Sequence, residues 1–497
     1  MARSKFAFLL PLACGAIYPL GFAPFDFYPA TFVALAGLYY LLNQTDRLSK
    51  GFCYAWLFGV GKFGVGVSWV YVALQQYGDV APPLATFFVM LFVGLLALIT
   101  GLVGLAMQWP KDRRLDNSMH ISRLAGCFYF AVVWVLYELI RTWLFTGFPI
   151  LDAGYVTVGT WLDGFAPIFG VKGVSFVVAF VAAALVSGWH LLACAGGVLV
   201  LCSLAGLLSF TERGEARQIG IAQINISLNE KWSMATSGAT FRIYEQLSQR
   251  MKAKDLVLWS EAAFVTTRPH LEEAFALVRA STGHRYIAGG YLEAANEQRY
   301  NSLLVYGEDS ANYRKLRLVP FGERVPLESF LRPLLSGFVE VPHSSLDVSD
   351  SNSRSLNVAG LRLAAAICYE ASFEFDTRDA VRQSDADAIV VVSEDAWFGD
   401  SLAPHQNFEM ARMRAREHGR YVIRAANSGI SGIVGPDGRL VAKAPQFQRT
   451  TLEGTVHTMR GATPFTRYGS LLLAMLLAAG FLTAVVLRGF EKRQVAR

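Results

Sequence analysis

The sequence predicts a protein in two parts: an α-helical transmembrane bundle of about eight helices and an extracytoplasmic α/β domain. Of its 497 residues, 53% are hydrophobic and only 17% are charged. The long apolar runs lie toward the two ends of the chain, and the polar block between them holds short β-rich runs that alternate with helical patterns. This composition excludes an ordinary soluble protein and indicates a membrane protein with one large polar domain.

Apolar runs of about 20 residues, enough to cross the hydrocarbon core of a bilayer, recur along the chain. They cover residues 6–23, 27–43, 52–75, 84–108, 124–146, 168–187, 190–210 and 468–487. We therefore expect a transmembrane domain of seven helices over residues 1–210. A catalytic domain follows over residues 211–462, and an eighth helix with a cytoplasmic tail over residues 463–497. Because six further runs follow the first one closely, we interpret the first run as a retained helix and not a cleaved signal.

The distribution of basic residues predicts the orientation in the membrane. With a cytoplasmic N-terminus, the connections at 24–26, 76–83 and 147–167 face outward, and they contain no Lys or Arg. The inward loops carry Arg47, Lys50, Lys111, Arg113, Arg114 and Arg123. Positive residues favour the cytoplasmic side, so the polar domain is expected in the periplasm of a bacterial inner membrane. The net charge of +6 is explained by these loops, and no nucleic-acid partner is predicted.

The polar block has the pattern of one α/β domain. Its expected strands are Ile219–Ile226, Leu256–Trp259, Tyr286–Tyr291, Ser302–Tyr306, Leu361–Ile367, Ile389–Val392, Tyr421–Ala425 and Ile430–Val434, and its expected helices cover 237–253, 271–281 and 404–418. Strands that alternate with helices indicate a sheet covered by helices. Pro436-Asp437-Gly438 predicts a turn between two strands.

We expect the chemistry at strand ends. Glu261 ends Leu-Val-Leu-Trp-Ser-Glu, Lys315 lies in Tyr-Arg-Lys-Leu-Arg-Leu-Val-Pro-Phe-Gly-Glu, which finishes at Glu323, and Cys368 ends Ala-Ala-Ile-Cys. Cys368 is also the only one of six cysteines outside a hydrophobic segment. A thiol with a pKa of about 8.5 needs a base to take its proton, and an oxyanion needs a cation or amide donors. Taken singly, each residue is more simply explained as a surface charge, a helix cap or an inert thiol.

The order of the motifs resembles that of a known superfamily. Trp-Ser-Glu, Pro-Phe-Gly-Glu, Cys-Tyr-Glu and Ser-Glu-Asp-Ala-Trp-Phe-Gly follow one another as in the nitrilase (carbon–nitrogen hydrolase) superfamily. That resemblance implies an αββα sandwich with a Glu–Lys–Cys triad. Together with the membrane spans, the chain resembles the bacterial apolipoprotein N-acyltransferase family over nearly its whole length. Further similar segments are Ser68–Tyr71, Phe145–Pro149, Ala396–Asp400 and Met410–Arg414.

The resemblance implies a role for each matching residue. Glu261 would be the general base, Cys368 the acylated nucleophile and Lys315 the group that stabilises the oxyanion. Supporting positions would be Glu323, Tyr369 and Glu370, and expected substrate-binding positions are Trp232, Trp397 and Phe398. The chain departs from the family pattern at Ser260, Ile150 and Glu394. Glu394 stands where Asn is usual and is expected to change the local electrostatics.

The resemblance also implies the reaction. A phospholipid, by resemblance phosphatidylethanolamine, would donate an acyl chain to the thiol, and the amine of a diacylated apolipoprotein would accept it. No metal cluster, phosphate loop or dinucleotide motif is visible in the sequence, so no cofactor is predicted. Two alternatives stay open: a membrane-tethered nitrilase-type amidase that uses water, and a transporter or scaffold with an inactive domain. Chain-length preference, the lipoproteins used and the oligomeric state are not predicted.

Two further features suggest a lipid substrate. Glu138 and Arg141 lie at positions i and i+3 of the fifth predicted span, either as an internal salt bridge or with Arg141 toward a lipid phosphate. Within 327–338 an apolar pattern at helical spacing is interrupted by Pro333. Its members are Leu327, Phe330, Leu331, Leu334, Leu335 and Phe338. The segment predicts either core packing or a mobile lid that carries Leu334 into the outer leaflet.

Overall fold

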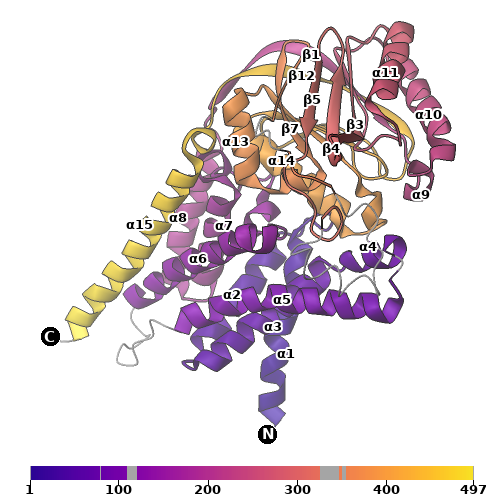
Figure 1. Cartoon of the computed structure of the whole chain (residues 1–497). Helices are drawn as coiled ribbons and strands as arrows, with labels where there is room; N and C mark the ends of the chain where they lie inside the picture. Colours follow the sequence, from indigo (N-terminus) through magenta and orange to yellow (C-terminus); the bar gives the residue numbers. More distant parts are fainter. Residues whose placement is uncertain (1, 79, 109–119, 325–345, 350–353, 496–497) are drawn as a thin grey trace. The chain divides into compact units, whose positions relative to one another are not determined.

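The computed structural model of the chain describes residues 2–78, 80–108, 120–324, 346–349 and 354–495 (Figure 1). The chain divides into two compact units. One comprises residues 1–71, 82–208 and 468–497, and the other comprises residues 72–81 and 209–467.

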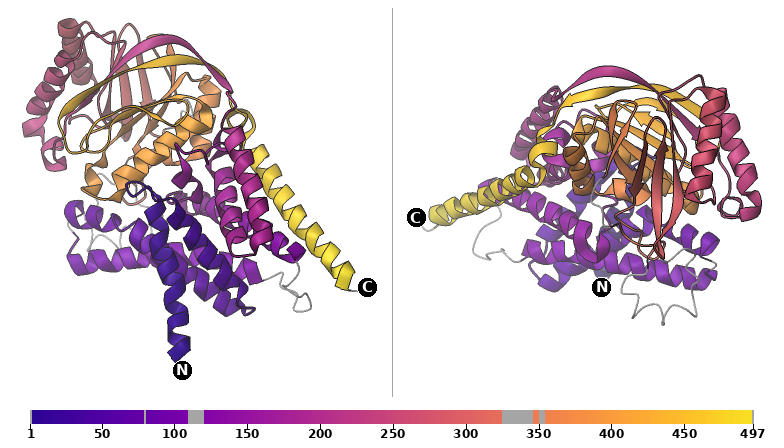
Figure 2. Two further views of the ribbon diagram at one scale, coloured as in Figure 1. Left: turned by 180° about the vertical axis from the view of Figure 1, so that it is seen from behind. Right: turned by 45° about the horizontal axis from the view of Figure 1, so that its top comes forward.

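The first unit is helical (Figures 1 and 2). Its helices are α1 (Ala2–Ile17), α2 (Pro29–Asn43), α3 (Leu48–Gly66), α5 (Pro82–Gln108), α6 (His120–Trp143), α7 (Ala166–Leu185), α8 (Trp189–Ala205) and most of α15 (Pro464–Val495). Small residues let neighbouring helices approach closely, as is common between helices in membranes. A Cβ added to Gly104 of α5 would lie 2.0 Å from the carbonyl oxygen of Gly51 in α3.

Several of these helices have the length and composition of membrane spans. Among the described residues, four qualify alone: Pro82–Gln108, Arg123–Thr146, Ala166–Leu185 and Pro464–Gly489. The pair formed by α3 and α4 (Val70–Tyr77) qualifies as a fifth if it is counted as one span. Shorter apolar helices are Phe8–Gly21, Pro29–Asn43 and Trp189–Ala205. Apolar helices thus occur where the sequence predicts them, and about eight crossings stays a prediction.

The expected span at 52–75 is not one straight helix. α3 ends at Gly66, and α4 begins at Val70 after a bend of 52°. At the break, the Ser68 hydroxyl donates to the carbonyl of Val65, three residues earlier, at 3.1 Å.

The second unit contains two six-stranded sheets. The first sheet has the order β12-β1-β2-β3-β4-β5 and the second β11-β10-β9-β8-β7-β6. The strands of the first are β1 (Thr211–Gln223), β2 (Leu256–Leu258), β3 (Tyr286–Ala295), β4 (Gln298–Tyr306), β5 (Ser310–Arg314) and β12 (Thr450–Gly461). Those of the second are β6 (Ser355–Val358), β7 (Leu361–Ile367), β8 (Ala388–Ser393), β9 (Tyr421–Ala426), β10 (Gly432–Val434) and β11 (Leu440–Lys443).

Helices cover the outer face of each sheet, which gives the four layers αββα (Figures 1 and 2). α10 (Ser237–Arg250) and α11 (Arg268–Thr282) pack on the first sheet, and α13 (Glu374–Ser384) and α14 (Leu402–His418) pack on the second. The central core joins apolar side chains of both sheets, for example Ile221, Leu303, Leu363 and Val390. Burial of this apolar surface on both faces holds the layers together.

All eight expected strands are present, and four strands were missed. The missed strands are β5, β6, β11 and β12, which are the two edges of each sheet. Edge strands are exposed along one side and carry polar residues, as in Ser-Ala-Asn-Tyr-Arg of β5, so they lack the apolar pattern of inner strands. The turn at Pro436–Gly438 is confirmed, since the Gly438 N–H donates to the Gly435 carbonyl at 2.9 Å.

Candidate active site

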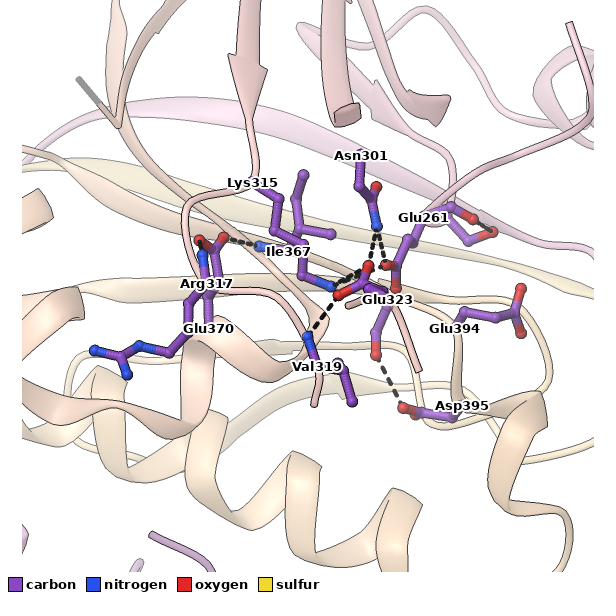
Figure 3. A network of polar contacts seen from close by, with 12 residues as sticks. Glu261, Asn301, Lys315, Arg317, Val319, Glu323, Ile367, Glu370, Glu394 and Asp395 are labelled. Atoms are coloured by element: carbon purple, nitrogen blue, oxygen red, sulfur yellow. Dashed lines mark hydrogen bonds and ion pairs between the residues drawn. The ribbon is translucent and has the colours of Figure 1, made fainter. Parts of the chain in front are cut away.

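Strand ends bring the buried Glu261 and Lys315 together with the half-buried Cys368. β2 is parallel to β1 and β3, β7 is parallel to β8, and such strands present loops with functional residues at their carboxyl ends. Glu261 follows β2, Lys315 follows β5 directly, and Cys368 follows β7 directly. The Lys315 Nζ lies 3.4 Å from Oε1 of Glu261 (Figure 3). The sequence therefore located this group of residues, while their catalytic roles stay predictions.

A second carboxylate and an amide hold the lysine in place (Figure 3). Glu323 Oε1 lies 2.9 Å from the Lys315 Nζ, and Glu323 Oε2 accepts the Val319 N–H at 2.8 Å. Asn301 Nδ2 donates to Glu261 Oε1 at 2.7 Å and to Glu323 Oε1 at 2.8 Å. Burial alone lowers the pKa of Lys315, but the charges of Glu323 and Glu261 outweigh it and raise the pKa above its ordinary value. The ammonium group therefore stays charged.

Cys368 sits on a sharp turn between β7 and a short 3₁₀ segment. Its φ is +53°, a left-handed conformation that residues with a Cβ rarely adopt and that often marks a functional position. Burial, and next the negative charge of Glu261, raise the pKa of the thiol to about 12, against the opposing effects of Lys315 and the hydrogen-bonding Ser393. The thiol is thus protonated at neutral pH and needs a base to become a nucleophile.

The predicted base, Glu261, has one bonded and one unbonded carboxylate oxygen. Its Oε1 accepts a hydrogen bond from Asn301, whereas its Oε2 is buried and has no hydrogen-bond partner among the described residues. A buried carboxylate oxygen without a partner is costly, and it is an acceptor for an incoming proton. The site therefore combines a protonated thiol, a carboxylate with one open acceptor atom and a fixed cation.

Glu370 holds the loops on either side of the site. Its carboxylate accepts the Tyr313 hydroxyl at 2.8 Å, the N–H of Leu316 at 2.8 Å, the N–H of Arg317 at 3.1 Å and the N–H of Ile367 at 2.8 Å. Leu316 follows Lys315, and Ile367 precedes Cys368. One wholly buried carboxylate thus links the lysine loop to the cysteine turn.

The four aromatic side chains predicted near the site lie on three different segments. Tyr369 follows Cys368, and its ring lies edge-on to Phe373 with centroids 5.0 Å apart. Trp232 follows the short helix α9 (Leu228–Lys231) and is half-buried. Trp397 and Phe398 end the 3₁₀ segment Asp395–Phe398 that follows β8, and both are half-buried. Their roles in substrate binding stay predictions.

The unusual Glu394 has a matched partner that the sequence did not reveal. Its carboxylate forms an ion pair with Lys231 and accepts Nδ2 of Asn427 at 3.1 Å. Burial raises the pKa of Glu394, while Lys231 and Asn427 counteract the rise. The neighbouring Asp395 pairs with Arg424 at 2.9 Å. The expected extra charge is therefore compensated inside the domain.

Arg141 is committed to protein acceptors in the helical unit. Only 1% of its surface is exposed, and its guanidinium pairs with Asp152 and donates to the carbonyls of Phe148 and Ile150. The expected salt bridge to Glu138 is wrong for the described structure: Glu138 Oε1 instead accepts the Trp134 indole N–H and the N–H of Ala153. A contact of Arg141 with a lipid phosphate stays a prediction without support from these bonds.

The apolar segment 327–338, with Leu334, lies outside the described residues. Among the residues that the structure describes, no group of three or more His, Cys, Asp or Glu side chains could hold a metal ion.

Comparison with known proteins matches two successive segments of the chain to family models. The family model "Apolipoprotein N-acyltransferase N-terminal domain" matches residues 14–184, and "Carbon-nitrogen hydrolase" matches residues 218–464. The chain is 35% identical to the apolipoprotein N-acyltransferase of Methylococcus capsulatus, over 93% of this chain and 92% of that one. It is 36% identical to that of Pseudomonas paraeruginosa, over 98% and 97%. Among solved structures, Nit3 of Saccharomyces cerevisiae, a member of the nitrilase superfamily, covers 49% of this chain and 91% of its own at 16% identity and a TM-score of 0.38.

Proposed function

The chain belongs to the apolipoprotein N-acyltransferase family, and on that premise we propose that it acylates the N-terminal amine of diacylated lipoproteins. It is an acyltransferase. The acyl donor in this proposal is a membrane phospholipid, with phosphatidylethanolamine suggested by the family resemblance, and the carrier is a thioester on Cys368. The observation that carries the proposal is the arrangement of Cys368, Glu261 and Lys315 in a chain that also has the family's N-terminal domain.

In the first half-reaction the Cys368 sulfur attacks the ester carbonyl of the phospholipid. The thiol proton passes to Oε2 of Glu261, the carboxylate oxygen that has no hydrogen-bond partner in the described part of the chain. Lys315 stabilises the negative charge that develops on the carbonyl oxygen, which commonly contributes a factor of about 10²–10³ in rate. The C–O bond of the ester then breaks, Glu261 returns the proton to the departing alcohol oxygen, and a lysophospholipid leaves.

In the second half-reaction the α-amine of the diacylglyceryl-cysteine attacks the thioester carbonyl. Glu261 takes a proton from the attacking nitrogen and transfers it to the departing sulfur of Cys368 as the C–S bond breaks. The product is an amide, and the thiol is restored. Both half-reactions use the same three groups.

We place this reaction at the outer face of a bacterial inner membrane. The absence of Lys and Arg from the three outward connections supports a periplasmic site. The apolar helices α8 and α15 flank the α/β unit in the sequence, so both of its ends continue into apolar segments. Domains at 1–210, 211–462 and 463–497 are part of the same proposal.

A lipopeptide acceptor tests this function against the amidase alternative. The full-length protein in phospholipid-containing micelles is incubated with a peptide that starts with S-diacylglyceryl-cysteine. Mass spectrometry should show one added acyl group, resistant to hydroxylamine because it is an amide. The matched control is the same lipopeptide with an acetylated amine, which has identical tails and should gain nothing. Release of fatty acid at an equal rate with both peptides would instead identify water as the acceptor.

A further inference from the structure

A buried lysine outside the triad is bonded to the main chain of the proposed base. Lys231 ends α9 and has no exposed surface. Its Nζ donates to the carbonyl oxygen of Glu261 at 2.6 Å and forms an ion pair with Glu394. A buried ammonium group is expensive unless it is paired and hydrogen-bonded, and Lys231 meets both conditions. Neither the carboxylate of Glu261 nor Lys315 takes part in these bonds.

The bonded carbonyl belongs to a constrained turn. Ala262 has a φ of +41°, in the left-handed region that a residue with a Cβ rarely adopts. Strand β3 lies directly against this turn. The Ala263 N–H donates to the Gly290 carbonyl at 2.7 Å, and a Cβ on Gly290 would lie 2.3 Å from the Ala262 nitrogen. A backbone in such a conformation persists only where its surroundings hold it. The Lys231 bond is one such support, applied at Glu261 itself.

The same bonds connect the base to the sheet that carries the nucleophile. Glu394 follows β8, which pairs with β7, the strand that ends at Cys368. Asn427 follows β9; its Nδ2 donates to Glu394 and to the Ile226 carbonyl at 2.9 Å, and Ile226 lies just before α9. The segment with Lys231 is further fixed by a capping box between Ser227 and Glu230. Glu261 is thus tied to the second sheet by a route that avoids Lys315.

From this geometry we propose that Lys231 is a positioning residue: its hydrogen bond to the Glu261 carbonyl, with its charge balanced by Glu394, holds the base in line with Cys368. The inference rests on the proposed acyl transfer. Lys231 does not touch the reacting atoms, so its loss should lower the rate of the chemical step and leave donor binding unchanged. A misplacement of about 1 Å in a catalytic group commonly lowers the rate about 10²-fold.

Two variants separate positioning from simple charge balance. Lys231→Met removes the bond to the Glu261 carbonyl and leaves Glu394 unpaired, whereas Lys231→Met combined with Glu394→Gln removes both charges. The acylation of Cys368 by phospholipid is followed by intact mass in a single turnover of the full-length protein. We expect both variants to acylate about 10–100-fold more slowly at saturating phospholipid, with the phospholipid concentration that gives half of the maximal rate unchanged. Recovery of the wild-type rate in the double variant would show that Lys231 only neutralises Glu394, and would overturn the proposal.

A lysine elsewhere in the same unit gives the matched control. Lys254 is 8% exposed and lies 2.5 Å from Glu453, but it precedes β2, at the end of the strand opposite to Glu261. Lys254→Met should acylate at the wild-type rate. A wild-type protein that forms no acyl adduct contradicts the proposed function, whereas a Lys231→Met protein that matches the wild type contradicts this inference alone. If Lys231→Met does not fold, the acylation rate of the double variant, which has no unpaired buried charge, tests the inference. A slowed rate supports the positioning role, and the wild-type rate overturns it.

Discussion

Replacement of Glu370 by Gln tests the connection between the lysine loop and the cysteine turn. In the structure Oε1 accepts the N–H groups of Leu316 and Arg317, and Oε2 accepts the N–H of Ile367. The Tyr313 hydroxyl lies 2.8 Å from both oxygens. A Gln amide has one oxygen and one NH₂ group, so in either orientation the NH₂ faces a backbone N–H donor.

The magnitude follows from these contacts. An unsatisfied buried donor costs about 1–3 kcal/mol, and hydrogen bonds to a charged acceptor contribute about 1.5–3 kcal/mol where neutral ones contribute about 1. One lost partner and several weakened bonds together give a loss of about 2–5 kcal/mol in the free energy of unfolding. For a unit of this size about 2–4 °C accompanies each kcal/mol, so the melting temperature should fall by roughly 4–20 °C. Because Leu316 and Ile367 adjoin Lys315 and Cys368, acyl transfer should fall as well.

Thermal melting of the purified full-length protein, with acyl transfer measured in parallel, checks this expectation. The matched control is Glu308→Gln. Glu308 is exposed and pairs with the exposed Arg285, so its loss should leave melting and activity unchanged. A Glu370→Gln protein that melts and reacts like the wild type would refute the role assigned to these bonds.

Three further predictions concern the reacting groups and the topology. Glu261→Gln should lower acyl transfer about 10²–10⁴-fold because the base is lost. Lys315→Met should lower it about 10²–10³-fold because the cation that stabilises the oxyanion is lost, and both variants should insert into the membrane normally. A variant whose rate is within a few-fold of the wild type would remove that residue from the mechanism. Because the pKa of Cys368 is raised to about 12, its thiolate fraction should grow with pH: alkylation by iodoacetamide, followed on the Cys368 peptide, should rise about tenfold per unit from pH 7 to pH 10, and a plateau below pH 9 would contradict the raised pKa. Alkaline phosphatase fused after residue 462 should be active and one fused after residue 115 inactive, and the reverse pattern would overturn the orientation.

An element of the fold is predictable from the sequence where its own residues form a recognisable apolar pattern. Inner strands such as β7 and β8 are almost entirely apolar, because both of their faces are buried, and Arg362 near the start of β7 is the main exception. The reactive residue directly after β7 is predictable for the same reason. The edge strands β5 and β6 are polar and short, so their pattern does not differ from that of loops. The break between α3 and α4 also lacks a signal, since both helices are apolar.

The rest of the site depends on contacts between distant segments. Asn301 bonds to Glu261 and Glu323, and Lys231 pairs with Glu394, 163 positions away in the sequence. Neither residue stands in a pattern that distinguishes it from a surface polar group. Glu394 was recognised as unusual, yet the charge that balances it could be found only once the fold brought α9 beside the end of β8.

The central claim is that Cys368 carries the acyl group, and intact mass tests it most directly. The full-length protein is given phospholipid without a lipoprotein acceptor, and its mass is compared with that of Cys368→Ala treated in the same way. The wild type should gain the mass of one acyl chain, and neutral hydroxylamine should remove it because a thioester is cleaved under those conditions. The same adduct on Cys368→Ala, or a wild-type adduct that resists hydroxylamine, would contradict the thioester on Cys368.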